Sequence, residues 1–173
     1  MKILINKKNL IPDETYQRFR KVRAVIENEL GEIAISIEGN KCIFPGGKCE
    51  ANEPEIEAIQ REIKEETGIE LKLSDFNKVL ELEAIYDDTL DYRTETIKPR
   101  HTITTYYYVK TNKNINENNM NLTQDEINDK FNISFVNKET LYKMLAEDHS
   151  NTRNGKMFDE ENQIVVDNII KNK

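Results

Sequence analysis

The sequence has no tryptophan, two cysteines and two histidines among its 173 residues. Cys42 and Cys49 are too few for a disulfide framework, and their spacing matches no zinc motif. We therefore interpret them as free thiols, which suits a reducing cytoplasm. No stretch approaches the roughly 18 apolar residues of a membrane span. The N-terminal apolar run, Ile3 to Asn6, is too short for a signal peptide. We expect a cytoplasmic protein that does not contact membranes.

An excess of positive charge is also absent. The net charge is −7, and 33% of the residues are charged against 37% hydrophobic. Non-specific nucleic-acid binding is therefore not expected. A chain of this composition that handles phosphates needs local cations, from a metal ion or from clustered arginine and lysine. Its length suits one domain, and we find no repeat or linker, so residues 1–173 are predicted to form a single domain.

An acidic stretch, REIKEETG at residues 61–68, sits in a predicted helix. Pro54 suits the first helical turn, Asn52 or Glu53 can cap it, and Gly68 suits the position after its end. Three glutamates share an arc beside the apolar stripe of this helix: Glu62, Glu65 and Glu66. Like charges three and four residues apart cost a few tenths of a kcal/mol per pair, so a bound cation is a candidate to offset the repulsion. Glu57 falls on the solvent side.

The remaining patterns predict strands interleaved with helices, as in an α/β or α+β sandwich on a mixed sheet. Alternating or apolar runs predict strands at Val22–Glu27, Glu32–Glu38, Val79–Tyr86, Ile103–Val109 and Ile133–Val136. Helical periodicity covers Lys138–Asp148 and Glu160–Ile170. The asparagine-dense residues 111–121 are predicted to form a surface loop.

Residues 47–69 resemble the Nudix box, G-x5-E-x7-R-E-U-x-E-E-x-G-U, in which U is aliphatic. Every fixed position matches: Gly47, Glu53, Arg61, Glu62, Ile63, Glu65, Glu66, Gly68 and Ile69. A chance match has a probability of less than roughly one in a million. The resemblance implies an α/β/α sandwich around a mixed β-sheet. It also implies hydrolysis of a nucleoside diphosphate linked to another group, by attack of water on phosphorus.

The same resemblance implies the metal site. Polyphosphate oxygens repel a nucleophile unless divalent cations neutralise them, and Mg²⁺ prefers carboxylate oxygens. The residues that match the family's metal ligands are Glu62, Glu65, Glu66 and the backbone carbonyl of Gly46. We expect Mg²⁺ as cofactor, with Mn²⁺ as a substitute.

The predicted catalytic residues are Glu53, Arg61, Glu62 and Glu65. Arg61 and Glu53 resemble the supporting pair that braces the glycine loop of the family. Arg61 lies about 100° round the helix from Glu62, so we expect it outside the acidic arc. The resemblance implies that one box glutamate, or one from a later loop, acts as the base. The identity of this base is left open. For the glutamate from a later loop, our choice is Glu126.

Two basic clusters flank predicted strands and could hold phosphates. The first is Arg18, Arg20, Lys21 and Arg23, and the second is Lys98, Arg100 and His101. From these we predict Arg23 and Arg100 as substrate-binding residues, with solvated surface charge as the alternative. His101 has no visible partner in the sequence and receives no catalytic role.

The substrate is predicted to be a small-molecule nucleotide: an ADP-sugar, a nucleoside triphosphate or a dinucleoside polyphosphate. The isopentenyl-diphosphate isomerase branch of the family relies on a tryptophan that this chain lacks. Two other functions stay open, namely a nucleotide-sensing module without turnover and an RNA 5′-end pyrophosphohydrolase. The acidic balance disfavours the latter. A homodimer is left open.

Overall fold

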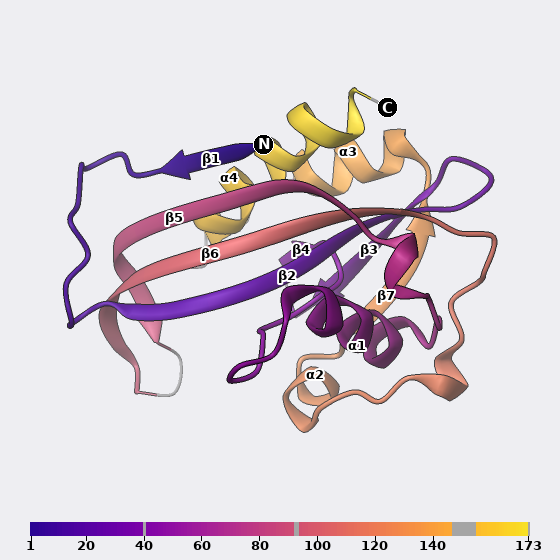
Figure 1. The fold of residues 1–173 in the computed structure, drawn as a ribbon, viewed down its shortest axis with the longest axis horizontal. Helices are drawn as coiled ribbons and strands as arrows, with labels where there is room; N and C mark the ends of the chain where they lie inside the picture. Colours follow the sequence, from indigo (N-terminus) through magenta and orange to yellow (C-terminus); the bar gives the residue numbers. More distant parts are fainter. Residues whose placement is uncertain (40, 92–93, 147–154, 173) are drawn as a thin grey trace.

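The computed structural model describes residues 1–39, 41–91, 94–146 and 155–172. Within this part of the chain, seven strands form one mixed sheet in the order β1-β5-β6-β2-β3-β4, with β7 paired to β3 (Figure 1). The strands are β1 (Lys2–Ile5), β2 (Gln17–Glu27), β3 (Ile33–Glu38), β4 (Lys41–Ile43), β5 (Asn77–Asp91), β6 (Thr96–Lys110) and β7 (Asn132–Val136). The β1–β5 and β2–β6 pairs are parallel, and the other pairs are antiparallel.

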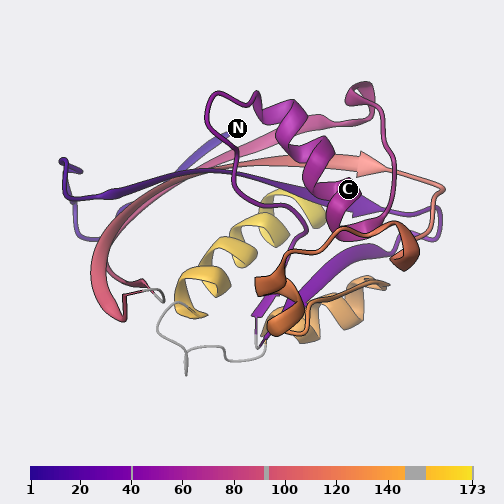
Figure 2. The same ribbon diagram turned by 90° about the horizontal axis from the view of Figure 1, so that it is seen from below.

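Helices cover both faces of the sheet (Figures 1 and 2). Helix α1 (Glu55–Thr67) and the short helix α2 (Gln124–Asn128) lie on one side, and α3 (Lys138–Ala146) and α4 (Gly155–Val165) on the other. A π-helical turn, η3 (Val166–Ile170), continues α4, and two 3-10 turns are η1 (Leu73–Asp75) and η2 (Glu117–Asn119). The predicted α/β/α sandwich is confirmed. In the described residues, no helix is long and apolar enough to cross a membrane.

Strand β2 shows why the two helical layers form. Its side chains alternate between the faces, as extended backbone requires. Val22 and Ile26 pack with Ile59 and Ile63 of α1, whereas Val25 packs with the apolar residues of α3, α4 and η3. All four of the named residues on the α1 side are fully buried, each contributing about 1.5–3 kcal/mol relative to exposure.

Several elements differ from the sequence-based expectation. Strands β5 and β6 are both longer than predicted, because mostly polar residues at their ends, such as Thr89 and Lys98, also pair across the hairpin. Strand β1 was not predicted; its register with β5 pairs Lys2 with Glu81 at the sheet edge. Helix α4 begins at Gly155, before the predicted Glu160. Helix α3 begins at the predicted Lys138, and residues 147 and 148 lie outside the described residues.

Candidate active site

The glycine loop, Phe44 to Gly47, runs alongside β2 and is hydrogen-bonded to it. The N–H of Ala24 donates to Pro45 O at 2.8 Å, and that of Val22 donates to Gly47 O at 2.9 Å. Gly46 has φ of +129°, and a Cβ there would lie 2.2 Å from Val22 O. At Gly47 a Cβ would lie 2.4 Å from the Glu62 carboxylate. At Gly46, where the clash is with backbone and φ is positive, only glycine permits this approach of the loop to the strand, whereas at Gly47 the clash is with a flexible side chain.

Helix α1 places the acidic residues against this loop. Its N-cap is Pro54, without a side-chain cap, so the expectation that Asn52 or Glu53 caps the helix is wrong. At the other end Gly68 adopts the left-handed conformation (φ +67°), and its N–H donates to Lys64 O at 2.9 Å, as predicted for a C-cap glycine. The buried apolar stripe of α1 fixes the rotation of the helix, which turns Glu62 and Glu66 toward the loop.

Glu66 is the most deeply buried of the three glutamates, with 6% of its surface exposed. Its Oε2 accepts a hydrogen bond from the Gly46 N–H at 2.8 Å. Burial raises the pKa of Glu66 from 4.5 to about 8, although the Gly46 N–H and the Arg23 charge oppose the rise. Burial also raises the pKa of Glu62, against the Arg61 hydrogen bond. Nearby carboxylates, including Glu126, add to both shifts.

Arg61 holds four groups together. It forms a two-pronged ion pair with Glu53, with N–O distances of 2.8 and 2.9 Å, so the predicted contact between these two residues is present. Its Nη1 also donates to Glu62 at 2.8 Å and to Glu65 at 3.1 Å, and its Nη2 to Lys48 O at 3.2 Å. The expectation that Arg61 stays outside the acidic arc is therefore wrong, because its long side chain spans the angular separation.

A cleft of about 520 Å³ lies between α1, the glycine loop, the sheet, α2 and the first turn of α4. Of the predicted site residues, those that line it are Gly46, Glu62, Glu66, Arg61, Arg23 and Arg100. Glu126 also lines it from α2, where its carboxylate accepts from the N–H and hydroxyl of Thr123. Glu53 and Glu65 are not among the lining residues and contact the site through Arg61.

Arg23, predicted to bind substrate, is almost completely buried. It is 7% exposed, and its Nη1 donates to Phe44 O and, at 3.4 Å, to Gly46 O. The side chain thus positions the glycine loop as well as lining the cleft. Its predicted neighbours Arg18 and Arg20 alternate to the opposite face, where Arg20 pairs with Glu55 of α1 at 3.6 Å. Only the odd-numbered half of that cluster, Lys21 and Arg23, reaches the cleft.

The donor set suits a hard divalent cation by its chemistry: the buried carboxylate of Glu66, the partly buried one of Glu62, a third from α2 and the Gly46 carbonyl surround one cleft. Within the described residues, no three acidic, histidine or cysteine side chains already converge as a metal-binding group. Arg61 bonds to Glu62 and Glu65, and Glu66 accepts from Gly46 instead. These residues fit a metal provided that the carboxylates turn from their present partners toward the ion.

The raised pKa of Glu66 predicts how the metal-free protein responds to pH. Because the folded pKa of about 8 exceeds the ordinary value of 4.5, the unfolded chain releases this proton first as pH rises. The stability contributed by the protonated form is complete below about pH 4.5 and declines up to about pH 8, by at most about 1.4 kcal/mol per pH unit. Urea unfolding in EDTA from pH 5 to 8 should show a steeper decline for the wild type than for Glu66→Gln. Equal slopes would contradict the shift.

Comparisons with known proteins define the class. A profile of the NUDIX domain matches residues 18–154. The chain therefore belongs to the NUDIX domain family. A search of curated proteins found no match.

Solved structures share the fold. The MutT protein of Methanosarcina mazei Go1 is 23% identical, with 87% of this chain and 99% of that chain covered and a TM-score of 0.53. A bifunctional NMN adenylyltransferase/ADP-ribose pyrophosphatase from Francisella tularensis, complexed with AMP and Mn ion, is 16% identical over 90% of this chain and 43% of that chain, with a TM-score of 0.57. The NUDIX domain of Shewanella oneidensis NrtR, cocrystallised with ADP-ribose, is 11% identical over 91% and 94%, with a TM-score of 0.55.

Proposed function

We propose that this protein is a Mg²⁺-dependent hydrolase that cleaves a phosphoanhydride bond in a nucleoside diphosphate linked to another group. The observation that carries the proposal is the cleft, which brings Glu62 and Glu66 together with the cations Arg23 and Arg100. Carboxylates can hold a divalent ion, and guanidinium groups can hold the phosphates that the ion neutralises. The two free cysteines support a cytoplasmic location.

The residues of this chain have distinct roles in the proposed reaction. Glu62, Glu65, Glu66 and the Gly46 carbonyl would hold Mg²⁺ or Mn²⁺, which when bound neutralises phosphate charge and orients water. Arg61 and Glu53 brace the helix against the loop, and Arg23 fixes the Gly46 carbonyl through its hydrogen bond. A carboxylate beside the cleft, from Glu65 or Glu126, takes the proton of the attacking water. The substrate phosphates lie against Arg23 and Arg100.

A second candidate is a module that binds a nucleotide in the same cleft without turnover. This alternative is suggested by the NrtR domain, which shares the fold and was cocrystallised with ADP-ribose. Chromatographic detection of hydrolysis products from a panel of ADP-ribose, NADH, dinucleoside polyphosphates, nucleoside triphosphates and capped RNA separates the two functions. A hydrolase releases phosphate or nucleotide from at least one compound only when Mg²⁺ or Mn²⁺ is present. Saturable binding with no product from any compound would favour the sensing module.

We expect millimolar Mg²⁺ or Mn²⁺ to raise the melting temperature. Free ligand at 100 times its dissociation constant stabilises the folded state by about 2.7 kcal/mol, and relief of repulsion among the three box glutamates adds to this effect. Melting should be followed at constant ionic strength with NaCl as the control salt. The same titration on a Glu65→Gln/Glu66→Gln double variant should show little shift. An unchanged wild-type melting temperature with both metals would argue against a metal site.

A further inference from the structure

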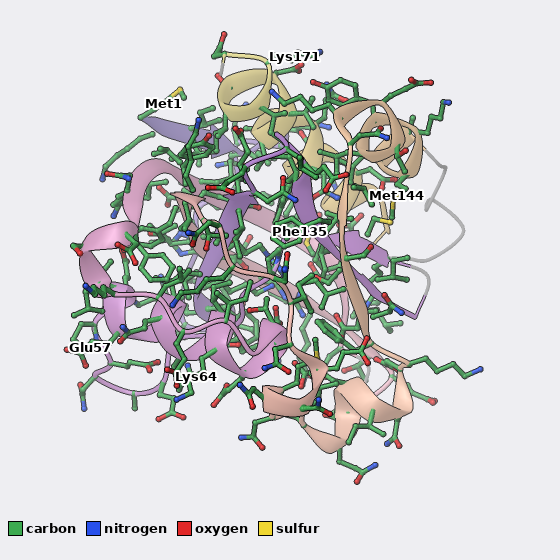
Figure 3. All side chains as sticks on the ribbon, turned by 90° about the vertical axis from the view of Figure 1, so that its right-hand side faces the viewer. Met1, Glu57, Lys64, Phe135, Met144 and Lys171 are labelled. Carbon is green, nitrogen blue, oxygen red and sulfur yellow. The ribbon has the colours of Figure 1, made fainter. Side chains whose placement is uncertain are left out.

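Helix α2, which lies beside α1, brings a carboxylate to the cleft (Figures 1 and 3). Glu126 of this helix lines the cleft together with Thr123, the N-cap residue of α2. The negative charge of Glu126 contributes to the raised pKa values of both Glu62 and Glu66. Glu126 is therefore within electrostatic reach of two proposed metal ligands on α1.

The two oxygens of the Glu126 carboxylate have different surroundings. Oε2 accepts hydrogen bonds from the backbone N–H of Thr123 at 2.6 Å and from its hydroxyl at 2.8 Å. The Thr123 hydroxyl oxygen in turn accepts from the Glu126 N–H at 3.3 Å. Among the described residues, Oε1 has no hydrogen-bond donor. One oxygen is thus held by Thr123, and the other is left for a molecule in the cleft.

Backbone hydrogen bonds hold α2 in position as well. The N–H of Phe131 donates to Glu126 O at 2.9 Å, and the N–H of Gly39, after β3, donates to Asp129 O at 2.8 Å. The reciprocal bonds between Thr123 and Glu126 form a capping box, whose usual effect is to stabilise the start of a helix. Here the same bonds also orient a carboxylate that lines a cleft, and an oriented group needs no rearrangement before it reacts.

Two other carboxylates are less suited to take a proton from water in the cleft. Glu65, the other candidate base, does not line the cleft, and its Oε2 accepts from Arg61 Nη1 at 3.1 Å. Asp125 lines the cleft, but it is exposed, and no donor among the described residues orients its side chain. Glu126 combines a place in the cleft with two orienting donors.

We propose that Thr123 is a positioning residue, which holds the carboxylate of Glu126 so that its Oε1 acts as the general base. Oε1 takes a proton from the water whose oxygen bonds to phosphorus. As that bond forms, the anhydride P–O bond breaks, and its electron pair leaves with the departing phosphate. The step keeps both bonds to Oε2, and with them the cap of α2, in place. This inference rests on the proposed function.

The first test measures steady-state hydrolysis of the best substrate of the panel with Mg²⁺. Glu126→Gln should lower kcat about a hundredfold, a contribution typical of a general base. Thr123→Val keeps the shape of the side chain but removes the hydroxyl. It should lower kcat about tenfold, as expected for the loss of one hydrogen bond to a charged group, with KM changed by less than about twofold. Thr123→Ser keeps the hydroxyl and should retain the wild-type kcat.

A combined variant shows whether Thr123 acts through Glu126. Thr123→Val should lower kcat no further in the Glu126→Gln background, because the base that the hydroxyl orients is already lost. Independent, multiplying losses would overturn the positioning role. Gln124→Ala is the matched control on α2. It removes the hydrogen bond from Gln124 Nε2 to Asn128 Oδ1 at 3.0 Å, outside the cleft, and should keep the wild-type kcat.

The second test does not use turnover. Mg²⁺ should raise the melting temperature of Thr123→Val as much as that of the wild type, because the proposed role of Thr123 is to orient the base and not a metal ligand. A smaller shift in this variant would assign the Thr123–Glu126 pair to the metal site and overturn the proposal. Melting curves without metal show whether each variant is folded. If Thr123→Val is not folded, Glu126→Gln remains decisive, since full activity in that variant would overturn the proposal.

The outcomes separate this inference from the proposed function. A wild type that hydrolyses a compound, with equal kcat in Thr123→Val and Thr123→Ser, would overturn the inference alone. Equal losses in Asp125→Asn and Glu126→Gln would overturn the assignment of the base, because they would reflect the charge of α2 and not one oriented carboxylate. A wild type that hydrolyses no compound would overturn the proposed function and this inference with it.

Discussion

Glu66→Gln and Glu65→Gln should each lower kcat/KM by on the order of a hundredfold or more while the protein stays folded. Glutamine keeps the shape of each side chain but removes the negative charge proposed to bind metal. At Glu66 the amide oxygen can still accept the Gly46 N–H that now bonds at 2.8 Å, so the loop keeps its anchor. Steady-state rates on the best substrate of the panel, with melting curves for each variant, measure both effects.

The matched control is Glu57→Gln on the same helix. Glu57 is exposed and points away from the body of the protein (Figure 3). The Glu57→Gln substitution removes one negative charge from α1, as the other two do, but at a position outside the cleft. The activity of this variant should therefore stay close to that of the wild type. Similar losses at positions 57, 65 and 66 would show that helix stability was being measured, and the metal-binding role would be abandoned.

Arg61→Ala should lower both stability and activity. Removing one partner of a buried ion pair costs about 3–5 kcal/mol. Here 28% of the Arg61 side chain is exposed, so we expect a loss of about 1–3 kcal/mol. The variant also leaves Glu62 and Glu65 without the guanidinium that now separates them. Mg²⁺ should therefore stabilise Arg61→Ala at least as much as it stabilises the wild type.

A double-mutant cycle isolates the contact itself. Arg61→Ala, Glu53→Ala and the double variant are each unfolded in urea, and the three losses are compared. The two-pronged contact at 2.8 and 2.9 Å predicts that the double loss is smaller than the sum of the single losses. Strictly additive losses in the free energy of unfolding would mean that Arg61 and Glu53 do not interact in solution. The proposal that this pair braces the helix against the loop would then be rejected.

Local signals explain what could be predicted from the sequence. The span of α1 was predicted closely because its apolar period, Pro54 and Gly68 all lie within one short segment. The contact between Arg61 and Glu53 followed from the motif. Helix α2 was missed, although Thr123 and Glu126 form a capping box whose spacing is visible in the sequence. The choice of Glu126 placed a residue in the cleft without predicting the helix that holds it.

The lysines that line the cleft, Lys21, Lys41 and Lys48, could not be predicted in the same way. Lys21 was one member of a charged cluster, and only strand alternation separates it from Arg18 and Arg20, which face the other side. Lys41 and Lys48 have no sequence pattern that marks them, and Phe158 belongs to a turn of α4 that begins before the predicted helix. Such a surface depends on long-range packing, which no single segment encodes.

The asparagine-rich loop, residues 111–121, is hydrogen-bonded to the C-terminal end of α1, which couples the local unfolding of the two segments. The N–H of Asn116 donates to Thr67 O and that of Asn121 to Glu65 O, both at 2.9 Å, so the loop satisfies carbonyls at the end of α1. A Cβ on Gly68 would lie 2.1 Å from Asn116 O, so the two segments are in close contact. Loop and helix therefore form one cooperative unit of local unfolding. When the last turn of α1 frays, the hydrogen bonds that hold Asn116 and Asn121 of the loop are lost in the same event.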